Sequence, residues 1–228
     1  TWLFRSKFVD LNEILTTDII TLHVPLNLGG IDKTYHLIDK EKLSRVNDGA
    51  ILINTSRGAV VNNIDLYDAI NKKNLKVVLD VWENEPAVNI ELINQVLIAT
   101  PHIAGYSLEG KVNGTRMIYN SICDFFNAER YFPFEKEVPQ YSLKQFEITD
   151  KIETGLEKLI SSIYSIQDDD KLMRKMLRMS KRDRIKYFDS LRKNYPIRRE
   201  FNNYSVQADN LSNEQKNILE KLRFNLFT

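Results

Sequence analysis

Three polar side chains with complementary chemistry, Arg57, Glu85 and His102, each follow a different short apolar segment of the sequence. A guanidinium holds a carboxylate through two parallel hydrogen bonds, and a histidine exchanges protons near neutral pH. A carboxylate beside the histidine would orient its ring. Because no side chain accepts a hydride, a nicotinamide cofactor completes such a set. The pattern predicts oxidation of a 2-hydroxy acid, with Arg57 holding the carboxylate and His102 taking the hydroxyl proton.

Polar residues of this kind also have plainer interpretations when each is taken alone. Arg57 could be a surface arginine at a strand–helix turn, and a lone histidine is more often structural than catalytic. We expect His23 to be a satisfied core residue inside an apolar strand and His36 to be a loop residue. Asp80 could face a nicotinamide or ribose, which we favour, or it could cap a helix or turn. Glu83 is expected to be a solvated loop charge.

Short apolar segments separated by helical patterns predict the scaffold that positions these residues. The expected buried strands span residues 18–24, 50–54, 77–81 and 96–100. The expected helices span residues 39–43, the segment that Asn62 caps, and residues 108–126. Short all-apolar strands between helices predict an α/β fold with a parallel sheet and helices on both faces. Ligands of such sheets bind beyond the carboxyl ends of the strands, where the polar residues stand.

The last third of the chain has a different pattern, which predicts a small α+β domain after a connector at 128–142. The expected elements are a helix at 152–166, a helix capped by Asp168–Asp170, a basic helix at 173–187, a strand at 201–208, a helix from Ser212 to about 222 and a strand at 224–227. The predicted domain ranges are 1–105 for a cofactor domain, 106–130 for a long helix returning towards a substrate domain, 131–145 for a linker and 146–228 for the C-terminal domain.

Composition narrows the class of protein. The 228 residues are 43% hydrophobic and 28% charged, which suits one large or two modest globular domains. The net charge of +1 provides no field that would attract nucleic acid. We expect no membrane span, because no apolar run approaches the necessary length. Cys123 is the single cysteine, so no intrachain disulfide can form, which fits a reducing, cytoplasmic compartment.

Three motifs occur in order along the chain: Arg57 followed by Gly58, the segment Asp80 to Pro86, and Pro-His-Ile-Ala-Gly at 101–105. This set resembles the D-2-hydroxyacid dehydrogenase superfamily, in which these motifs carry the active site. The longer string at 101–111 and the tail segment at 191–200 resemble one branch, the erythronate-4-phosphate dehydrogenases. The resemblance covers nearly the whole chain.

The resemblance implies a partial Rossmann-like NAD-binding domain followed by a C-terminal dimerisation domain, in a cytoplasmic homodimer. It implies oxidation of 4-phospho-D-erythronate, a small phosphorylated 2-hydroxy acid, to 3-hydroxy-2-oxo-4-phosphooxybutanoate on the route to pyridoxal phosphate (vitamin B6). His102 would transfer the proton, Glu85 would support His102, and Arg57 would bind the substrate carboxylate. NAD contacts are implied for Val24, Thr55, Ser56, Arg57, Asp80 and Gly105, and a substrate contact for Tyr106.

The sequence departs from the family pattern at several points. It contains no Gly-x-Gly-x-x-Gly loop, so this loop, the acidic ribose-binding residue and the front half of the substrate domain would precede Thr1. We therefore expect this polypeptide by itself to bind NAD poorly and to turn over little or nothing; turnover near that of full-length relatives would refute this. Asn62 replaces a more usual aspartate with little expected consequence, and Val24 replaces a frequent threonine, which removes a side-chain hydrogen bond.

Two other functions stay open from the sequence. One is another member of the superfamily, acting on glycerate, lactate or phosphoglycerate; the tail at 191–200 argues against it. The other is an inactive dimerising fragment or a corepressor-like binding module, against which the retained arginine, carboxylate and histidine argue. Arg192, Arg198 and Arg199 could bind a phosphate across a dimer interface, but we expect them to be solvated or paired with neighbours such as Glu200.

Overall fold

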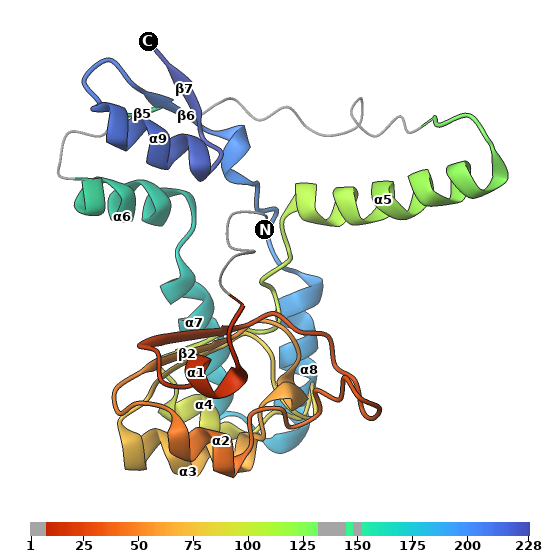
Figure 1. Ribbon diagram of the computed structural model, residues 1–228, viewed down its shortest axis with the longest axis vertical. Helices are drawn as coiled ribbons and strands as arrows, with labels where there is room; N and C mark the ends of the chain where they lie inside the picture. Colours follow the sequence, from red (N-terminus) through yellow and green to blue (C-terminus); the bar gives the residue numbers. More distant parts are fainter. Residues whose placement is uncertain (1–7, 132–144, 148–151) are drawn as a thin grey trace. The chain divides into compact units, whose positions relative to one another are not determined.

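The computed structural model describes residues 8–131, 145–147 and 152–228, and it divides into two compact units (Figure 1). The first unit consists of the described residues up to Ala104 together with Ile166–Tyr195. The second consists of Gly105–Ser165 and Pro196–Thr228. The predicted connector and linker lie largely outside the described residues. No helix in the described part of the chain is both long and apolar enough to cross a membrane.

A parallel sheet forms the centre of the first unit, as predicted. Its four strands lie in the order β1 (Ile19–Leu22), β2 (Ile51–Asn54), β3 (Lys76–Leu79) and β4 (Ile98–Ala99). The register pairs Leu22 with Asn54, Asn54 with Leu79, and Leu79 with Ala99. All four carboxyl ends therefore lie at one edge of the sheet, and the residue after each strand lies near its neighbours.

Burial alternates along the strands, because successive side chains of a strand point to opposite faces. In β1, Ile20 and Leu22 are buried, whereas Ile19 is 60% exposed. The core is completed by helices that connect the strands: α2 (Lys40–Arg45), α3 (Asn63–Lys73) and α4 (Ile90–Gln95). Each leucine or isoleucine fully buried in this core stabilises the fold by about 1.5–3 kcal/mol.

Short polar side chains begin these helices. Asn62 accepts hydrogen bonds from the backbone N–H groups of Ile64 and Asp65 at the start of α3, which confirms the predicted cap. Asp39 and Asn89 cap α2 and α4 in the same way. Such caps satisfy N–H groups that have no partner inside the helix.

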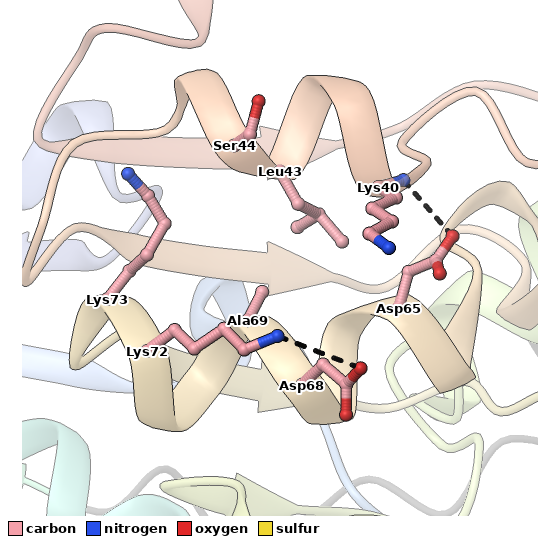
Figure 2. A pocket seen from close by; sticks show the side chains of 8 residues that line it. All are labelled: Lys40, Leu43, Ser44, Asp65, Asp68, Ala69, Lys72 and Lys73. Atoms are coloured by element: carbon pink, nitrogen blue, oxygen red, sulfur yellow. Dashed lines mark hydrogen bonds and ion pairs between the residues drawn. The ribbon is translucent and has the colours of Figure 1, made fainter.

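A cavity of about 220 Å³ lies between α2 and α3 (Figure 2). Beside it, the backbone N–H of Lys40 donates to Asp65 Oδ2 at 3.1 Å, and Lys72 Nζ lies 4.0 Å from Asp68 Oδ2. The lining residues are Lys40, Leu43, Ser44, Asp65, Asp68, Ala69, Lys72 and Lys73. None of the predicted site residues is among them, so this cavity is separate from the polar edge of the sheet.

Residues 166–195 pack against the sheet through α7 (Ile166–Arg174), a 3-10 helix (Lys175–Arg178) and α8 (Lys181–Lys193). Their side chains Met173, Met176 and Phe188 are fully buried in the sheet's own core. Asp170 Oδ1 accepts the backbone N–H of Ala99 in β4 at 2.8 Å. Arg174 donates to the carbonyls of Ile93 and Val96, both at 2.8 Å. This segment therefore closes the edge of the sheet at β4.

This packing differs from the sequence expectations for the same segment. The predicted C-terminal range 146–228 includes α7 and α8, which the structure groups with the sheet because their apolar side chains bury there. Asp168–Asp170 lie within α7 and do not cap a helix. The predicted basic helix at 173–187 is interrupted, because Ser180 caps a new helix by accepting the N–H of Asp183.

The second unit contains a three-stranded parallel sheet and the long helix predicted at 108–126. The sheet has the order β5 (Gln145–Glu147), β6 (Ser205–Gln207) and β7 (Asn225–Phe227). Helices α6 (Ile152–Ile163) and α9 (Asn213–Lys221) belong to the same unit, and Ser212 caps α9 as predicted. Residues 201–203 form a 3-10 helix, so the predicted strand at 201–208 is shortened to β6. The buried hydrophobic core of the second unit consists of Leu159, Val206, Ala208, Leu211, Leu219 and Phe224.

The long helix α5 (Leu108–Phe126) is tied at its first turn to the segment around Arg199. Glu109 accepts a hydrogen bond from Arg199 Nε and, at 2.9 Å, from the backbone N–H of Glu200. Arg199 thus pairs with Glu109, and the Arg198 guanidinium lies 4.7 Å from the centre of the Tyr164 ring. Burial raises the pKa of Glu109, but these hydrogen bonds outweigh it and lower the pKa below its ordinary value.

We predict that Glu109→Gln lowers the thermal midpoint of unfolding near pH 6 and that this effect becomes smaller as the pH falls. A carboxyl whose folded pKa is depressed contributes stability above its unfolded pKa, and this contribution disappears as the pH falls through the folded pKa. Circular dichroism melts at a series of pH values measure the difference. Glu157→Gln on the exposed side of α6 is the control. A difference between wild type and Glu109→Gln that is the same at every pH would contradict the prediction.

Candidate active site

The carboxyl edge of the first sheet carries the histidine–carboxylate pair that the sequence predicts. His102 Nδ1 lies 2.7 Å from Glu85 Oε2, and the two side chains are 28% and 19% exposed. Glu85 Oε1 accepts the backbone N–H of Trp82 at 2.8 Å. An ionised carboxylate only accepts hydrogen bonds, so the proton of the neutral ring is on Nδ1 and Nε2 keeps a lone pair. That lone pair can accept a proton from a substrate hydroxyl.

The turn that presents His102 is held by Asp80, which is 3% exposed. Asp80 Oδ1 accepts the hydroxyl of Thr100 at 2.6 Å and the N–H of Ile103 at 2.8 Å, and Oδ2 accepts the N–H of Ala104 at 2.9 Å. A buried carboxylate requires such donors. Asp80 therefore caps the turn, which is the second of the two interpretations open from the sequence. Its contact with a cofactor stays a prediction.

Arg57 lies on a turn that Asn54, wholly buried at the end of β2, holds in place. Asn54 Nδ2 donates to the Arg57 carbonyl at 3.0 Å, and Asn54 Oδ1 accepts the N–H and hydroxyl of Ser56. The Arg57 side chain is exposed, and its Nη1 donates to the Ser56 carbonyl at 2.7 Å. Among the described residues no hydrogen bond joins this guanidinium to Glu85 or His102, so their convergence on one substrate stays a prediction.

Gly58 brings the Arg57 turn into backbone contact with the loop that carries Glu85. A Cβ at Gly58 would lie 2.0 Å from the carbonyl carbon and oxygen of Trp82 and 2.5 Å from the backbone nitrogen of Glu83. Real Cβ atoms do not approach so closely, so only glycine fits here. The Arg57 turn and the Trp82–Pro86 loop are therefore positioned against each other by their backbones.

The remaining predicted residues occupy different places. Val24 and Thr55 are half-buried just beyond the ends of β1 and β2, and Ser56 is buried. Gly105 and Tyr106 belong to the second unit. A Cβ at Gly105 would meet nothing within 4 Å, and Lys111 Nζ lies 4.0 Å from the centre of the Tyr106 ring.

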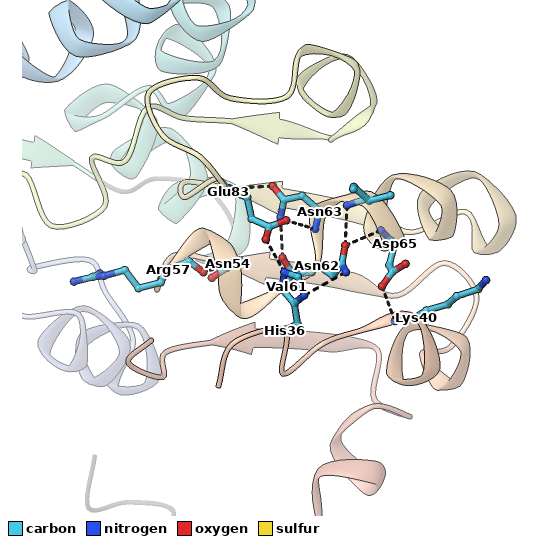
Figure 3. A network of polar contacts seen from close by, with 10 residues as sticks. His36, Lys40, Asn54, Arg57, Val61, Asn62, Asn63, Asp65 and Glu83 are labelled. Carbon is cyan, nitrogen blue, oxygen red and sulfur yellow. Dashed lines mark hydrogen bonds and ion pairs between the residues drawn. The ribbon is translucent and has the colours of Figure 1, made fainter. Parts of the chain in front are cut away.

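Two sequence expectations about single residues are wrong. His23 is exposed, with Nε2 2.8 Å from Thr21 Oγ1, because it directly follows β1 and continues the alternation that exposes Thr21. Glu83 is not a solvated charge: its side chain is 16% exposed and lies 2.6 Å from His36 Nε2 (Figure 3). His36 is a loop residue as expected, with a φ of 51°.

Three residues that position the site were not singled out from the sequence. Asn54 holds the Arg57 turn, and Thr100 binds Asp80. Trp82 Nε1 donates to the Thr100 carbonyl at 2.9 Å, which joins the Glu85 loop to the His102 turn. Asn54 and Thr100 could have been found from the sequence, because each is a polar residue at the end of an apolar strand, where a buried polar group requires a partner.

The amino-acid sequence of the chain matches those of known proteins. Residues 3–104 match the family model of the D-isomer specific 2-hydroxyacid dehydrogenase, NAD binding domain. The erythronate-4-phosphate dehydrogenase of Proteus mirabilis is 41% identical over 208 residues, which cover 90% of this chain and 54% of the relative. That of Psychromonas ingrahamii is 38% identical over 222 residues, covering 96% and 56%. Residues 3–104 therefore belong to the NAD binding domain family of the D-isomer specific 2-hydroxyacid dehydrogenases.

Residues 138–222 match a second family model, which describes a domain of unknown function. The chain spans about half the length of the curated dehydrogenases that it matches.

We predict a single tautomer for the neutral ring of His102, with the proton on Nδ1. Two-bond ¹H–¹⁵N correlation spectra of the labelled chain distinguish the two ring nitrogens. Glu85→Leu removes the acceptor and should leave His102 as a mixture of tautomers. The exposed His23 serves as the internal control in both samples. A His102 ring protonated mainly on Nε2 in the wild type would disprove the assignment.

We also predict that Gly58→Ala lowers the free energy of unfolding by about 1–3 kcal/mol, because the added methyl group overpacks against the Trp82–Glu83 peptide. Urea unfolding followed by circular dichroism measures the change. The matched control is Gly29→Ala, since a Cβ at Gly29 would meet nothing within 4 Å. Equal stability of the two variants would show that the close approach has no energetic consequence.

Proposed function

We propose that the protein oxidises 4-phospho-D-erythronate to 3-hydroxy-2-oxo-4-phosphooxybutanoate with NAD, as a step towards pyridoxal phosphate. The observation that carries the proposal is the hydrogen-bonded Glu85–His102 pair at the carboxyl edge of a parallel sheet, with the Arg57 turn packed against the same loop. The relatives that match 90% and 96% of this chain are named erythronate-4-phosphate dehydrogenases, which supports this substrate over the other 2-hydroxy acids.

The residues present fit a dinucleotide just beyond β2. The Arg57 side chain is exposed there and Thr55 is half-buried, so both can contact a ligand, and Val24 and Ser56 flank them in the proposal. Asp80 already uses both carboxylate oxygens on the turn after β4, so any contact it makes would come in addition to those bonds. When bound, NAD supplies the acceptor for the hydride that leaves C2 of the substrate.

The chain's own residues handle the proton and the carboxylate. In the proposed reaction, the C2 hydroxyl proton moves to His102 Nε2 as the C2 hydride leaves, so the hydroxyl becomes a carbonyl. Glu85 stabilises the positive charge that His102 gains, because its Oε2 already accepts the Nδ1 proton. Arg57 holds the substrate carboxylate through its planar fork and keeps C2 in place. Tyr106 is proposed as a further substrate contact.

We also propose a cytoplasmic homodimer assembled through the C-terminal part of the chain. The support is the resemblance of the tail at 191–200 to that branch, together with the single cysteine. The phosphate role considered for Arg199 has weak support, because this side chain already pairs with Glu109 and Asn203.

We predict that His102→Asn lowers kcat by about 10²–10⁴-fold, because the proton acceptor is lost. Arg57→Lys should mainly raise the KM for the hydroxy acid, since an ammonium lacks the fork. NADH formation is measured with the protein encoded by the whole reading frame, with phosphoerythronate, D-glycerate and D-lactate compared as substrates. His23→Asn is the control, because this histidine is exposed. A higher kcat/KM for D-glycerate or D-lactate would overturn the proposed substrate, and full activity of His102→Asn would overturn the mechanism.

A further inference from the structure

A second histidine–carboxylate pair lies on the same loop as Glu85. His36 Nε2 is 2.6 Å from Glu83 Oε1, and the two side chains are 26% and 16% exposed. Glu83 stands two positions before Glu85, yet the proposed reaction uses only Glu85. A largely buried carboxylate has a desolvation cost even when a histidine donates to it, so the pair is weak evidence for stability alone. Its surroundings indicate what it does.

Glu83 is fixed to the start of α3 by reciprocal hydrogen bonds (Figure 3). Its Oε2 accepts the backbone N–H of Asn63 at 2.8 Å, and its own N–H donates to Asn63 Oδ1 at 3.2 Å. Asn63 Nδ2 in turn donates to the Val61 carbonyl at 2.9 Å. The side chain and the backbone of Glu83 are thus both bound to the same helix end.

His36 closes the network from a third segment. Its backbone N–H donates to the Ala59 carbonyl at 2.7 Å, and its Nδ1 lies 3.3 Å from Asn62 Nδ2. The Asn62 oxygen already accepts two N–H groups of α3, so its amide NH₂ faces the histidine. Because that NH₂ only donates, His36 Nδ1 must be the acceptor. The ring proton is therefore on Nε2, which donates a hydrogen bond to Glu83. His36 therefore has the tautomer opposite to that of His102.

The Trp82–Glu83 peptide is held from two directions as a result. Gly58 packs against one side of it, and the Glu83 N–H is bound by Asn63. The backbone N–H of Trp82, which directly precedes this peptide, donates a hydrogen bond to Glu85 Oε1. The direction of the Trp82 N–H thus sets where Glu85 points and whether its Oε2 meets His102.

We propose that His36 and Glu83 are positioning residues, which hold the Trp82–Pro86 loop so that Glu85 keeps His102 in its proton-accepting tautomer. The role of that tautomer in catalysis rests on the proposed function, whereas the positioning itself does not. Glu83 uses Oε1 for His36 and Oε2 for Asn63, so Glu83→Gln replaces one of these two acceptors with an NH₂ group and removes one bond. A leucine at 36 leaves Glu83 without its imidazole donor.

The first test uses the chain itself, with ¹⁵N spectra of its three histidines. We expect Glu83→Gln and His36→Leu to convert His102 from a single Nδ1–H tautomer to a mixture. His36→Gln, whose amide nitrogen can replace the imidazole Nε2 donor, should leave the His102 signals close to wild type. Glu91→Gln, an exposed charge change on α4, is the matched control.

Unchanged His102 signals in folded Glu83→Gln and His36→Leu would overturn the proposal. If both variants fail to fold, the wild-type spectrum still decides, because a His36 protonated on Nδ1 contradicts the network and one protonated on Nε2 supports it.

The second test measures kinetics of the protein encoded by the whole reading frame. Glu83→Gln and His36→Leu should lower kcat roughly 10- to 100-fold with little change in the KM for the hydroxy acid, because a displaced Glu85 affects proton transfer more than binding. His36→Gln should recover most of the wild-type kcat. A raised KM with unchanged kcat would contradict the positioning role. Absence of dehydrogenase activity in the wild type would contradict the proposed function and leave the spectroscopic test valid.

Discussion

The buried carboxylate of Asp80 is the interaction on which the site depends. A charge at 3% exposure is tolerated only because one hydroxyl and two backbone N–H groups donate to it. These donors all come from the turn after β4, so the end of β3 and the turn that carries His102 are bound together. Together with the hydrogen bond from Trp82 Nε1 to the Thr100 carbonyl, this tie positions the backbone at His102, which has a φ of 58°, relative to the neighbouring loop.

Three carboxylates on one short loop have separate tasks because each has different donors. Asp80 binds the turn after β4, Glu83 binds the start of α3 and His36, and Glu85 binds the ring of His102. Their separation along the chain is small, but their side chains leave the backbone in different directions. This arrangement lets a loop without regular secondary structure hold a histidine ring in one orientation, which a general base requires.

The two units of the chain differ in how they relate to the sequence. The first unit combines the residues up to Ala104 with residues 166–195. Met173, Met176 and Phe188 of the later segment are buried beside the strands of the family's NAD binding domain. Arg174 and Asp170 then occupy backbone groups of β4 and α4 that would otherwise lack partners. A segment that follows the matched domain in sequence is therefore part of the same core, and its removal would expose that core.

Local patterns in the sequence determined the elements of this protein, because strand and helix formation depend on neighbouring residues. The apolar runs that became β1 to β4, the caps at Asn62 and Ser212, and the helix at 108–126 all follow from side-chain type and spacing. The placement of polar residues at one edge also followed, since parallel strands have their carboxyl ends on the same side. From this the pairing of Glu85 with His102 could be predicted.

Only the tertiary structure decided which charges are buried and which histidines have partners. His23 follows β1 on the same exposed side as Thr21, and Glu83 is enclosed because α3 and His36 approach it. Residues 168–170 lie inside a helix because α7 packs on β4. In each case the sequence shows the side chain but not the segment that packs against it. Burial of a side chain depends on the segment that packs against it, and the two come together only when distant parts of the chain meet.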